Sequence, residues 1–238
     1  MKKLVICAGP TAVGKTSVLR HVIRKLLAKN IRVAYLKNDV QYATDAVVLA
    51  EEFGIPTATE YSGEFCPDHA SVTTLYDHIR WAWSLGTEVF LVETAGLCLR
   101  CAPYALPKES LGIVVLEETS GIDLPFKIGP MLTLADVAMI TKIDMVSPAE
   151  REIFLARTRK AAPNVRVLEV NAQAGIGIDP LVTRILNTPD LAENDFPTLR
   201  GHPPLGTCTV CSGERSMNPN RHRGVVAITG GGTRFSGQ

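Results

Sequence analysis

Eight residues near the N-terminus have the types and spacing of a phosphate-binding loop. Residues 9–16, GPTAVGKT, follow the Walker A spacing. The glycines permit a tight turn, and backbone N–H groups together with the start of the following helix can bind phosphate oxygens. Lys15 can reach the β- and γ-phosphates, and the Thr16 hydroxyl can hold Mg²⁺. We therefore predict Lys15 as a catalytic residue and a nucleotide site that contains Gly9, Ala12, Val13, Gly14, Lys15, Thr16 and Ser17.

A second motif, further along the chain, predicts a site for guanine. Thr141-Lys142-Ile143-Asp144 follows an apolar run at 135–140. The Asp144 carboxylate can accept from guanine N1–H and N2–H₂, a pair of donors that adenine lacks. The Lys142 stem can pack on the base. Asn171 and Ala172 follow the next predicted strand and can supply backbone contacts to the guanine O6. The predicted base site therefore contains Thr141, Lys142, Asp144, Asn171 and Ala172, and the predicted nucleotide is GTP.

Two acidic residues stand where apolar runs end. Asp39 ends the segment that begins with the apolar run at 32–36, and Glu93 ends the apolar run at 88–93. Ligands of open α/β sheets bind at the carboxyl ends of the strands. We predict that Asp39 and Thr16 hold Mg²⁺, that Glu93 contacts the Mg²⁺ shell or orients the attacking water, and that the Gly96 N–H faces the γ-phosphate. Asp39 and Glu93 join Lys15 as predicted catalytic residues.

The elements that must position these residues alternate along the chain. Apolar runs interleaved with stretches of helical periodicity are typical of a parallel sheet covered by helices on both faces. We predict an α/β fold of the P-loop NTPase type, with a mostly parallel sheet. The predicted strands are 3–8, 32–36, 56–61, 88–93, 111–116, 135–140 and 165–170, and the predicted helices are 16–30, 46–53, 69–85, 148–161 and 180–186.

Length and composition limit the class of protein. The chain has 238 residues, 25 basic and 24 acidic, and a net charge of +1, which gives no electrostatic case for binding nucleic acid. No apolar run approaches the ~20 residues of a membrane span, so we expect a cytoplasmic protein without a membrane partner. The composition changes after Thr188. We predict a GTPase domain at 1–190 and a small irregular appendix, rich in Cys, Pro and Gly, at 191–238.

Five of the six cysteines stand in metal-binding patterns. Two pairs have the Cys-x-x-Cys spacing, and a fifth cysteine stands three residues before a histidine. Thiolates at this spacing suit Zn²⁺, Ni²⁺ or an iron–sulfur cluster. Incidental cysteines and a redox dithiol are the alternatives, and the pairs can form one site or two. The predicted donors are Cys66, His69, Cys98, Cys101, Cys208 and Cys211, whereas Cys7 is expected to be a buried strand residue.

In their order, these motifs resemble the nickel-insertion GTPases of urease and hydrogenase maturation, which share a class with the cobalamin-synthesis-related metallochaperones. The resemblance runs from Lys3 to about Leu186. It implies a GTP-driven homodimer that carries a metal and delivers it to a client metalloenzyme or its maturation complex. The segments that carry it are the Walker A loop, Lys37-Asn38-Asp39, Cys66-Pro67-Asp68-His69, Glu93-Thr94-Ala95-Gly96, Lys127-Ile128-Gly129-Pro130 and Thr141-Lys142-Ile143-Asp144.

The chain also departs from the pattern of that family. Asp68 is an extra residue within the Cys-Pro-His motif of the urease-type proteins, and the two Cys-x-x-Cys pairs are foreign to the pattern of the family. These departures indicate a relative with a different client, and they leave open a different metal. The leading hypothesis is a GTP-hydrolysing metallochaperone. The alternatives are a P-loop ATPase or small-molecule kinase with a structural zinc or iron–sulfur site, and a metal-binding scaffold that does not hydrolyse nucleotide.

Overall fold

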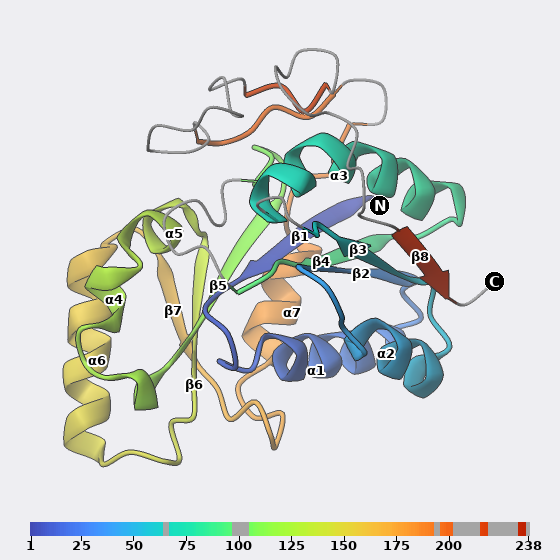
Figure 1. Ribbon diagram of the computed structural model, residues 1–238. Coiled ribbons are helices and arrows are strands. Elements are labelled where there is room, and N and C mark those ends of the chain that lie inside the picture. The colour runs from blue at the N-terminus through green and yellow to red at the C-terminus, as the bar shows by residue number, and fades with distance from the viewer. Residues whose placement is uncertain (64–66, 97–104, 193–195, 202–214, 219–232, 237–238) are drawn as a thin grey trace.

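An eight-stranded sheet forms the centre of the protein (Figure 1). The computed structural model describes all residues except 64–66, 97–104, 193–195, 202–214, 219–232 and 237–238. Seven strands are parallel, and the last pairs antiparallel with its neighbour. In spatial order the strands are β7 (Arg166–Glu169), β6 (Val137–Thr141), β5 (Leu111–Glu117), β1 (Lys3–Ala8), β4 (Val89–Glu93), β2 (Val33–Asp39), β3 (Thr57–Tyr61) and β8 (Thr233–Ser236).

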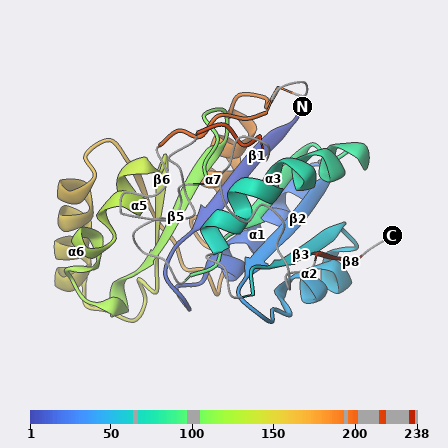
Figure 2. The same cartoon turned by 45° about the horizontal axis from the view of Figure 1, so that its top comes forward.

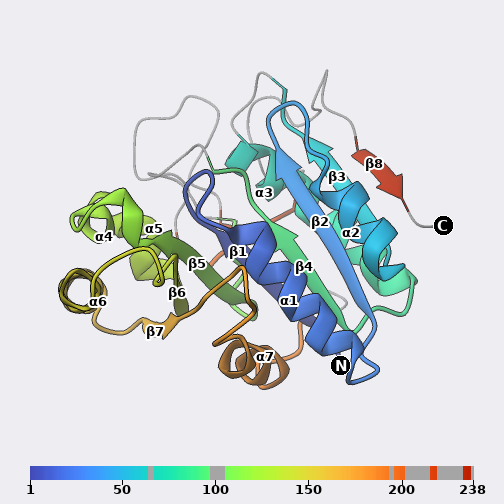
Figure 3. The ribbon, with the colours of Figure 1, turned by 90° about the horizontal axis from the view of Figure 1, so that it is seen from below.

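Helices cover both faces of the sheet, as Figures 2 and 3 show from two further directions. Among the described residues no helix is long and apolar enough to cross a bilayer. One face carries α1 (Lys15–Leu27), α2 (Asp45–Phe53) and α7 (Asp179–Leu186). The other carries α3 (Pro67–Ser84), α4 (Leu124–Lys127), α5 (Gly129–Leu134) and α6 (Pro148–Ala161), and a 3₁₀ turn spans Glu118–Ser120.

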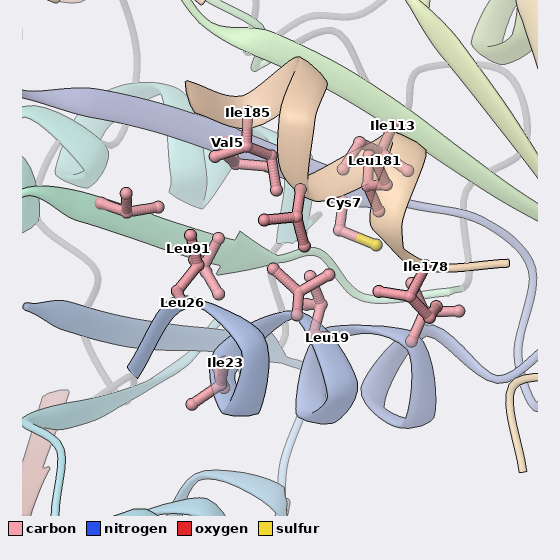
Figure 4. Close-up of a cluster of buried hydrophobic side chains, with 14 of the residues drawn as sticks. Val5, Cys7, Leu19, Ile23, Leu26, Leu91, Ile113, Ile178, Leu181 and Ile185 are labelled. Atoms are coloured by element: carbon pink, nitrogen blue, oxygen red, sulfur yellow. The ribbon is translucent and has the colours of Figure 1, made fainter. Parts of the chain in front are cut away.

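The core between α1, α7 and the sheet fixes the start of α1 at the end of β1 (Figure 4). Leu19, Ile23 and Leu26 recur at helical spacing on the face of α1 that packs on the strands, and all three are fully buried. Burying each such side chain contributes about 1.5–3 kcal/mol. Cys7 lies in this core, and burial raises the pKa of its thiol. Cys7 is thus a buried strand residue, as the sequence predicted.

The predicted mostly parallel sheet with helices on both faces is confirmed, with three corrections. The short helices α4 and α5 were not predicted. The strand predicted at 135–140 is Val137–Thr141, so the guanine motif begins inside the strand rather than after it. The appendix is not wholly irregular, because Thr233–Ser236 forms β8 at the edge of the sheet beside β3.

The part of the appendix around Leu199 and Arg200 is anchored at the amino end of β5. The Arg200 guanidinium donates to Ser110 O (2.9 Å) and Leu134 O (3.0 Å) and lies 2.9 Å from the Asp136 carboxylate. Leu199 pairs antiparallel with Pro107. These contacts join the appendix to the predicted GTPase domain, and the boundary at residue 190 stays a prediction.

Replacing Arg200 with Met should destabilise the protein by about 1–3 kcal/mol, because two carbonyl oxygens and a carboxylate lose a charged donor in a half-buried place. The free energy of unfolding from urea titration measures the loss. The exposed Arg159 provides the control, and Arg159→Met should leave stability nearly unchanged. Equal stabilities of the two variants would contradict this role of Arg200.

Candidate functional site

The loop between β1 and α1 has the backbone shape that its glycines permit. Gly14 precedes α1 with φ of 93°, in the left-handed region that favours glycine. A Cβ at Gly9 would lie 2.4 Å from Val115 O, so this position has no room for a side chain. The residues of the Walker A motif therefore follow from backbone geometry as well as from phosphate chemistry.

Most of the residues predicted to contact the phosphates line one cavity of about 500 Å³, whereas Gly9 and Val13 are not among its lining residues. Gly96 lines this cavity and lies against the phosphate loop, where a Cβ at Gly96 would lie 2.7 Å from Thr11 N. The strand-end acids reach this cavity from β2 and β4, which are neighbours in the sheet but not in the sequence. Its lining residues are Thr11, Ala12, Gly14, Lys15, Thr16, Ser17, Lys37, Asp39, Asp45, Glu93 and Gly96.

The Lys15 ammonium donates to two carbonyl oxygens of its own loop, Gly9 O (3.0 Å) and Pro10 O (2.9 Å). Burial lowers the pKa of Lys15, and the nearby Glu93 carboxylate opposes that shift. These neutral carbonyls are weaker partners for the ammonium than a phosphate would be, because a phosphate adds the attraction of an opposite charge. Lys15 is thus placed to exchange them for phosphate oxygens.

Glu93 is the most heavily hydrogen-bonded side chain of the cavity. Its carboxylate is 1% exposed. The Thr16 hydroxyl lies 3.0 Å from both carboxylate oxygens and donates to the carboxylate. The Tyr35 hydroxyl donates to Oε2 at 2.8 Å, and the Lys37 ammonium donates to Oε1 at 2.5 Å. The carboxylate therefore fixes the orientation of the Thr16 hydroxyl.

The sequence did not assign roles to Tyr35, Lys37 and Asp45. Lys37 also lies 3.2 Å from Asp45 Oδ2. Burial lowers the pKa of Lys37, but Glu93 and Asp45 outweigh burial, so the pKa is raised and the ammonium stays charged. Burial and the Glu93 charge raise the pKa of Tyr35. The strand predicted at 32–36 extends in the structure to Asp39, so Lys37 is a buried residue of β2 rather than one that follows it.

The donors beside the loop suit a hard cation. Thr16 and Asp39 present a hydroxyl and a carboxylate to the cavity, and Mg²⁺ prefers such oxygen ligands. One Asp39 oxygen, Oδ1, accepts from Val40 N at 2.7 Å. That bond holds the side chain at the end of β2. The predicted Mg²⁺ ligands are therefore chemically suited to the ion and lie on the same cavity.

The predicted guanine residues line a second cavity, of about 410 Å³, on the other side of the loop. The Thr141 hydroxyl lies 2.7 Å from Val13 O and 3.0 Å from Leu116 O, so it ties the guanine motif to the phosphate loop. Arg20 and His21 of α1 line this cavity and were not predicted. Its lining residues are Ala12, Val13, Gly14, Ser17, Arg20, His21, Thr141, Lys142, Asp144, Met145, Asn171, Ala172 and Gln173.

Local geometry shapes the base pocket at both of its motifs. Lys142 has φ of 58°, and its ammonium pairs with the Glu117 carboxylate. Asn171 Oδ1 accepts from Gln173 N (3.1 Å) and Ala174 N (2.9 Å), which forms a tight turn after β7. The exposed Asp144 carboxylate lines the same cavity. The second cavity thus contains the Asp144 carboxylate and the turn at Asn171, the two features that were predicted to contact the guanine base.

The predicted transition-metal donors fall almost wholly outside the described residues. Cys66, Cys98, Cys101, Cys208 and Cys211 lie there, and His69 belongs to the first turn of α3 without a described side chain. Among the side chains that the structure does describe, no group of three His, Cys, Asp or Glu residues is arranged to hold a metal ion. These donors stay predictions.

Comparison with known proteins relates this geometry to a family. Residues 3–169 match the CobW/HypB/UreG nucleotide-binding domain. The chain is 40% identical to an uncharacterized protein of Methanocaldococcus jannaschii, over 99% of this chain and 100% of that one. It is 27% identical to urease accessory protein UreG 2 of Methylobacterium radiotolerans, over 74% and 89% of the two chains.

Solved structures extend the match to the fold. HypB from Helicobacter pylori, crystallised in complex with nickel, superposes with a TM-score of 0.60 at 19% identity, over 78% of this chain and 86% of that one. The likeness confirms the P-loop NTPase fold. The resemblance found in the sequence is also confirmed, and the chain belongs to the CobW/HypB/UreG family of nucleotide-binding proteins.

Proposed function

We propose that this chain is a GTP-hydrolysing metallochaperone of the cytoplasm, which binds a soft transition metal and delivers it to a client metalloenzyme. The observation that carries the GTP half is the pair of cavities on either side of the phosphate loop. They share Ala12, Gly14 and Ser17. One cavity contains the residues that suit phosphates and Mg²⁺, and the other contains the Asp144 carboxylate. A single guanine nucleotide can therefore occupy both.

The proposed hydrolysis divides the work among the residues of the first cavity. Thr16 and Asp39 would hold Mg²⁺, which neutralises phosphate charge when it is bound. Lys15 stabilises the charge that develops on the β- and γ-phosphates. Glu93 acts through Thr16, whose hydroxyl it orients. Three donors already engage the Glu93 carboxylate, which favours this indirect role over orienting the attacking water.

Family membership and the described flanks of the two Cys-x-x-Cys pairs support the metal half. Segment 197–200 pairs antiparallel with Pro107 on one side and with Ser216 on the other. Residues 105–108 and 215–217 therefore run in the same direction. Cys101 and Cys211 each stand four residues before one of these segments, which begin at Ala105 and Arg215. Four residues span at most ~14 Å, and a single four-thiolate site formed by the two pairs is part of the proposal.

We further propose that the metal is Ni²⁺ or Zn²⁺, or that an iron–sulfur cluster takes its place, since thiolates suit all three. HypB from Helicobacter pylori binds nickel in its crystal structure. The proposal includes a homodimer that acts with the client or its maturation complex. An ion shared between two subunits would link metal transfer to assembly of the dimer. Metal analysis of protein purified anaerobically, with a visible spectrum, distinguishes these ligands.

Lys15→Ala should lower the rate of GTP hydrolysis by about 100-fold or more, because the variant lacks the ammonium that stabilises charge on the phosphates. Phosphate release measures the rate. The exposed Lys29, beyond the end of α1, is a matched control. Turnover near that of the wild type in Lys15→Ala would exclude the proposed phosphate site.

Asp144→Asn should weaken GTP binding by about 100-fold, because the amide places a donor where guanine needs an acceptor. Xanthosine triphosphate has a carbonyl at that position and should bind the variant better than GTP does. Calorimetry with GTP, ATP and xanthosine triphosphate tests both statements. Asp123→Asn, an exposed change beside α4, should alter none of these affinities, and equal affinity of the wild type for GTP and ATP would favour the ATPase alternative.

Metal affinity should differ about 5–150-fold between the GTP and GDP states. Gly96 lines the phosphate cavity and is followed immediately in sequence by the segment that contains Cys98 and Cys101. If nucleotide and metal favour the same arrangement of this segment, each must strengthen binding of the other. Metal titrations with GDP and with a non-hydrolysable GTP analogue measure the ratio. Cys66→Ala and Cys98→Ala should weaken metal binding, whereas Cys7→Ala should not. Identical affinities in both nucleotide states would leave a GTPase with a structural metal.

A further inference from the structure

Lys37 joins the phosphate cavity to the first turn of α2. Lys37 and Glu93 are register partners on the neighbouring strands β2 and β4. The Lys37 side chain is only 8% exposed, yet it lines the cavity. Its ammonium contacts Glu93 Oε1 at 2.5 Å and Asp45 Oδ2 at 3.2 Å. One buried cation is therefore shared between two carboxylates on different elements.

The two carboxylates hold the ammonium unequally. Glu93 is 1% exposed and gives the shorter contact, so water screens that ion pair little. The Asp45 side chain is 38% exposed, and its contact is longer. Any further anion in the cavity competes first with the weaker partner. The pair that a phosphate can break is thus Lys37–Asp45.

Asp45 also ties α2 to the sheet through this ion pair. It is the first residue of the helix, and Thr44 at the N-cap makes no side-chain cap hydrogen bond. Ala46 and Leu49 pack on the core, whereas Val47 and Val48 are exposed. Loss of the Lys37 contact would loosen the first turn of α2, which carries those two valines on the outer surface.

We propose that Lys37 is a sensor of the terminal phosphate: a triphosphate draws its ammonium away from Asp45 and so releases the first turn of α2. The inference rests on the proposed binding of GTP by this cavity. A diphosphate lacks the terminal anion and leaves the Lys37–Asp45 pair in place. Lys37 is a specificity-determining residue, because it discriminates triphosphate from diphosphate, and Asp45 is a positioning residue that acts through it.

Nucleotide affinities test the sensing step. Lys37→Met should weaken binding of a non-hydrolysable GTP analogue by about tenfold or more and binding of GDP by less than about threefold, because only the analogue loses a charge-assisted hydrogen bond. Lys37→Arg keeps the charge and should retain most of the preference for the analogue. An equal loss of affinity for the two nucleotides would mean that Lys37 only supports Glu93, and would overturn the proposal.

Hydrogen exchange of the α2 amides tests the release. In the wild type these amides should exchange faster with the GTP analogue than with GDP. Asp45→Asn, a change at a partly exposed side chain, should make exchange fast in both states. Lys25→Met is the matched control, because it breaks an exposed 2.7 Å ion pair with Asp179 outside the cavity. Exchange in Asp45→Asn that still depends on nucleotide as in the wild type would overturn the proposal.

These outcomes are separable from failure of the proposed function. A wild-type protein that binds neither guanine nucleotide would contradict GTP binding itself. A wild type that prefers the GTP analogue, together with a Lys37→Met variant that keeps the same preference, would contradict the Lys37 inference alone.

Discussion

The buried carboxylate of Glu93 is the constraint on which the nucleotide site depends. An ionised group removed from water costs several kcal/mol unless charge and hydrogen bonds compensate for it. Here the Lys37 ammonium supplies the charge, and the hydroxyls of Tyr35 and Thr16 complete the hydrogen bonds. These partners come from β2 and α1, whereas Glu93 ends β4. Satisfying one carboxylate therefore fixes two strands and the start of the phosphate-binding helix relative to one another.

Much of the fold and of the nucleotide site could be predicted because their signals are local. The Walker A loop needs a strand, a glycine turn and a helix within a short stretch of sequence, and each carries its own pattern. The fully apolar runs also predicted a parallel sheet, because both faces of such strands are buried. The structure then brings Asp39, Glu93 and Gly96 to one cavity, as expected for residues at the carboxyl ends of neighbouring strands.

The elements and residues that were missed depend on contacts between distant segments. The role of Lys37 follows from the register of β2 against β4, which sequence spacing does not reveal. The antiparallel pairing of β8 with β3 joins segments from opposite ends of the chain. No helix was predicted at Gly129 and Pro130, yet these residues begin α5, because the first turn of a helix accommodates proline well.

The described residues on either side of 97–104 lie at opposite ends of the parallel strands. At one end Gly96 lies so close to the phosphate loop that a Cβ would contact Thr11 N at 2.7 Å. At the other end Leu106 O accepts from Arg200 N at 2.8 Å, beside the amino end of β5. Gly96 therefore follows the carboxyl end of β4, whereas Leu106 lies near the amino end of β5. The phosphate loop and the anchor of the appendix are thus joined in sequence by the stretch that contains the predicted donors Cys98 and Cys101.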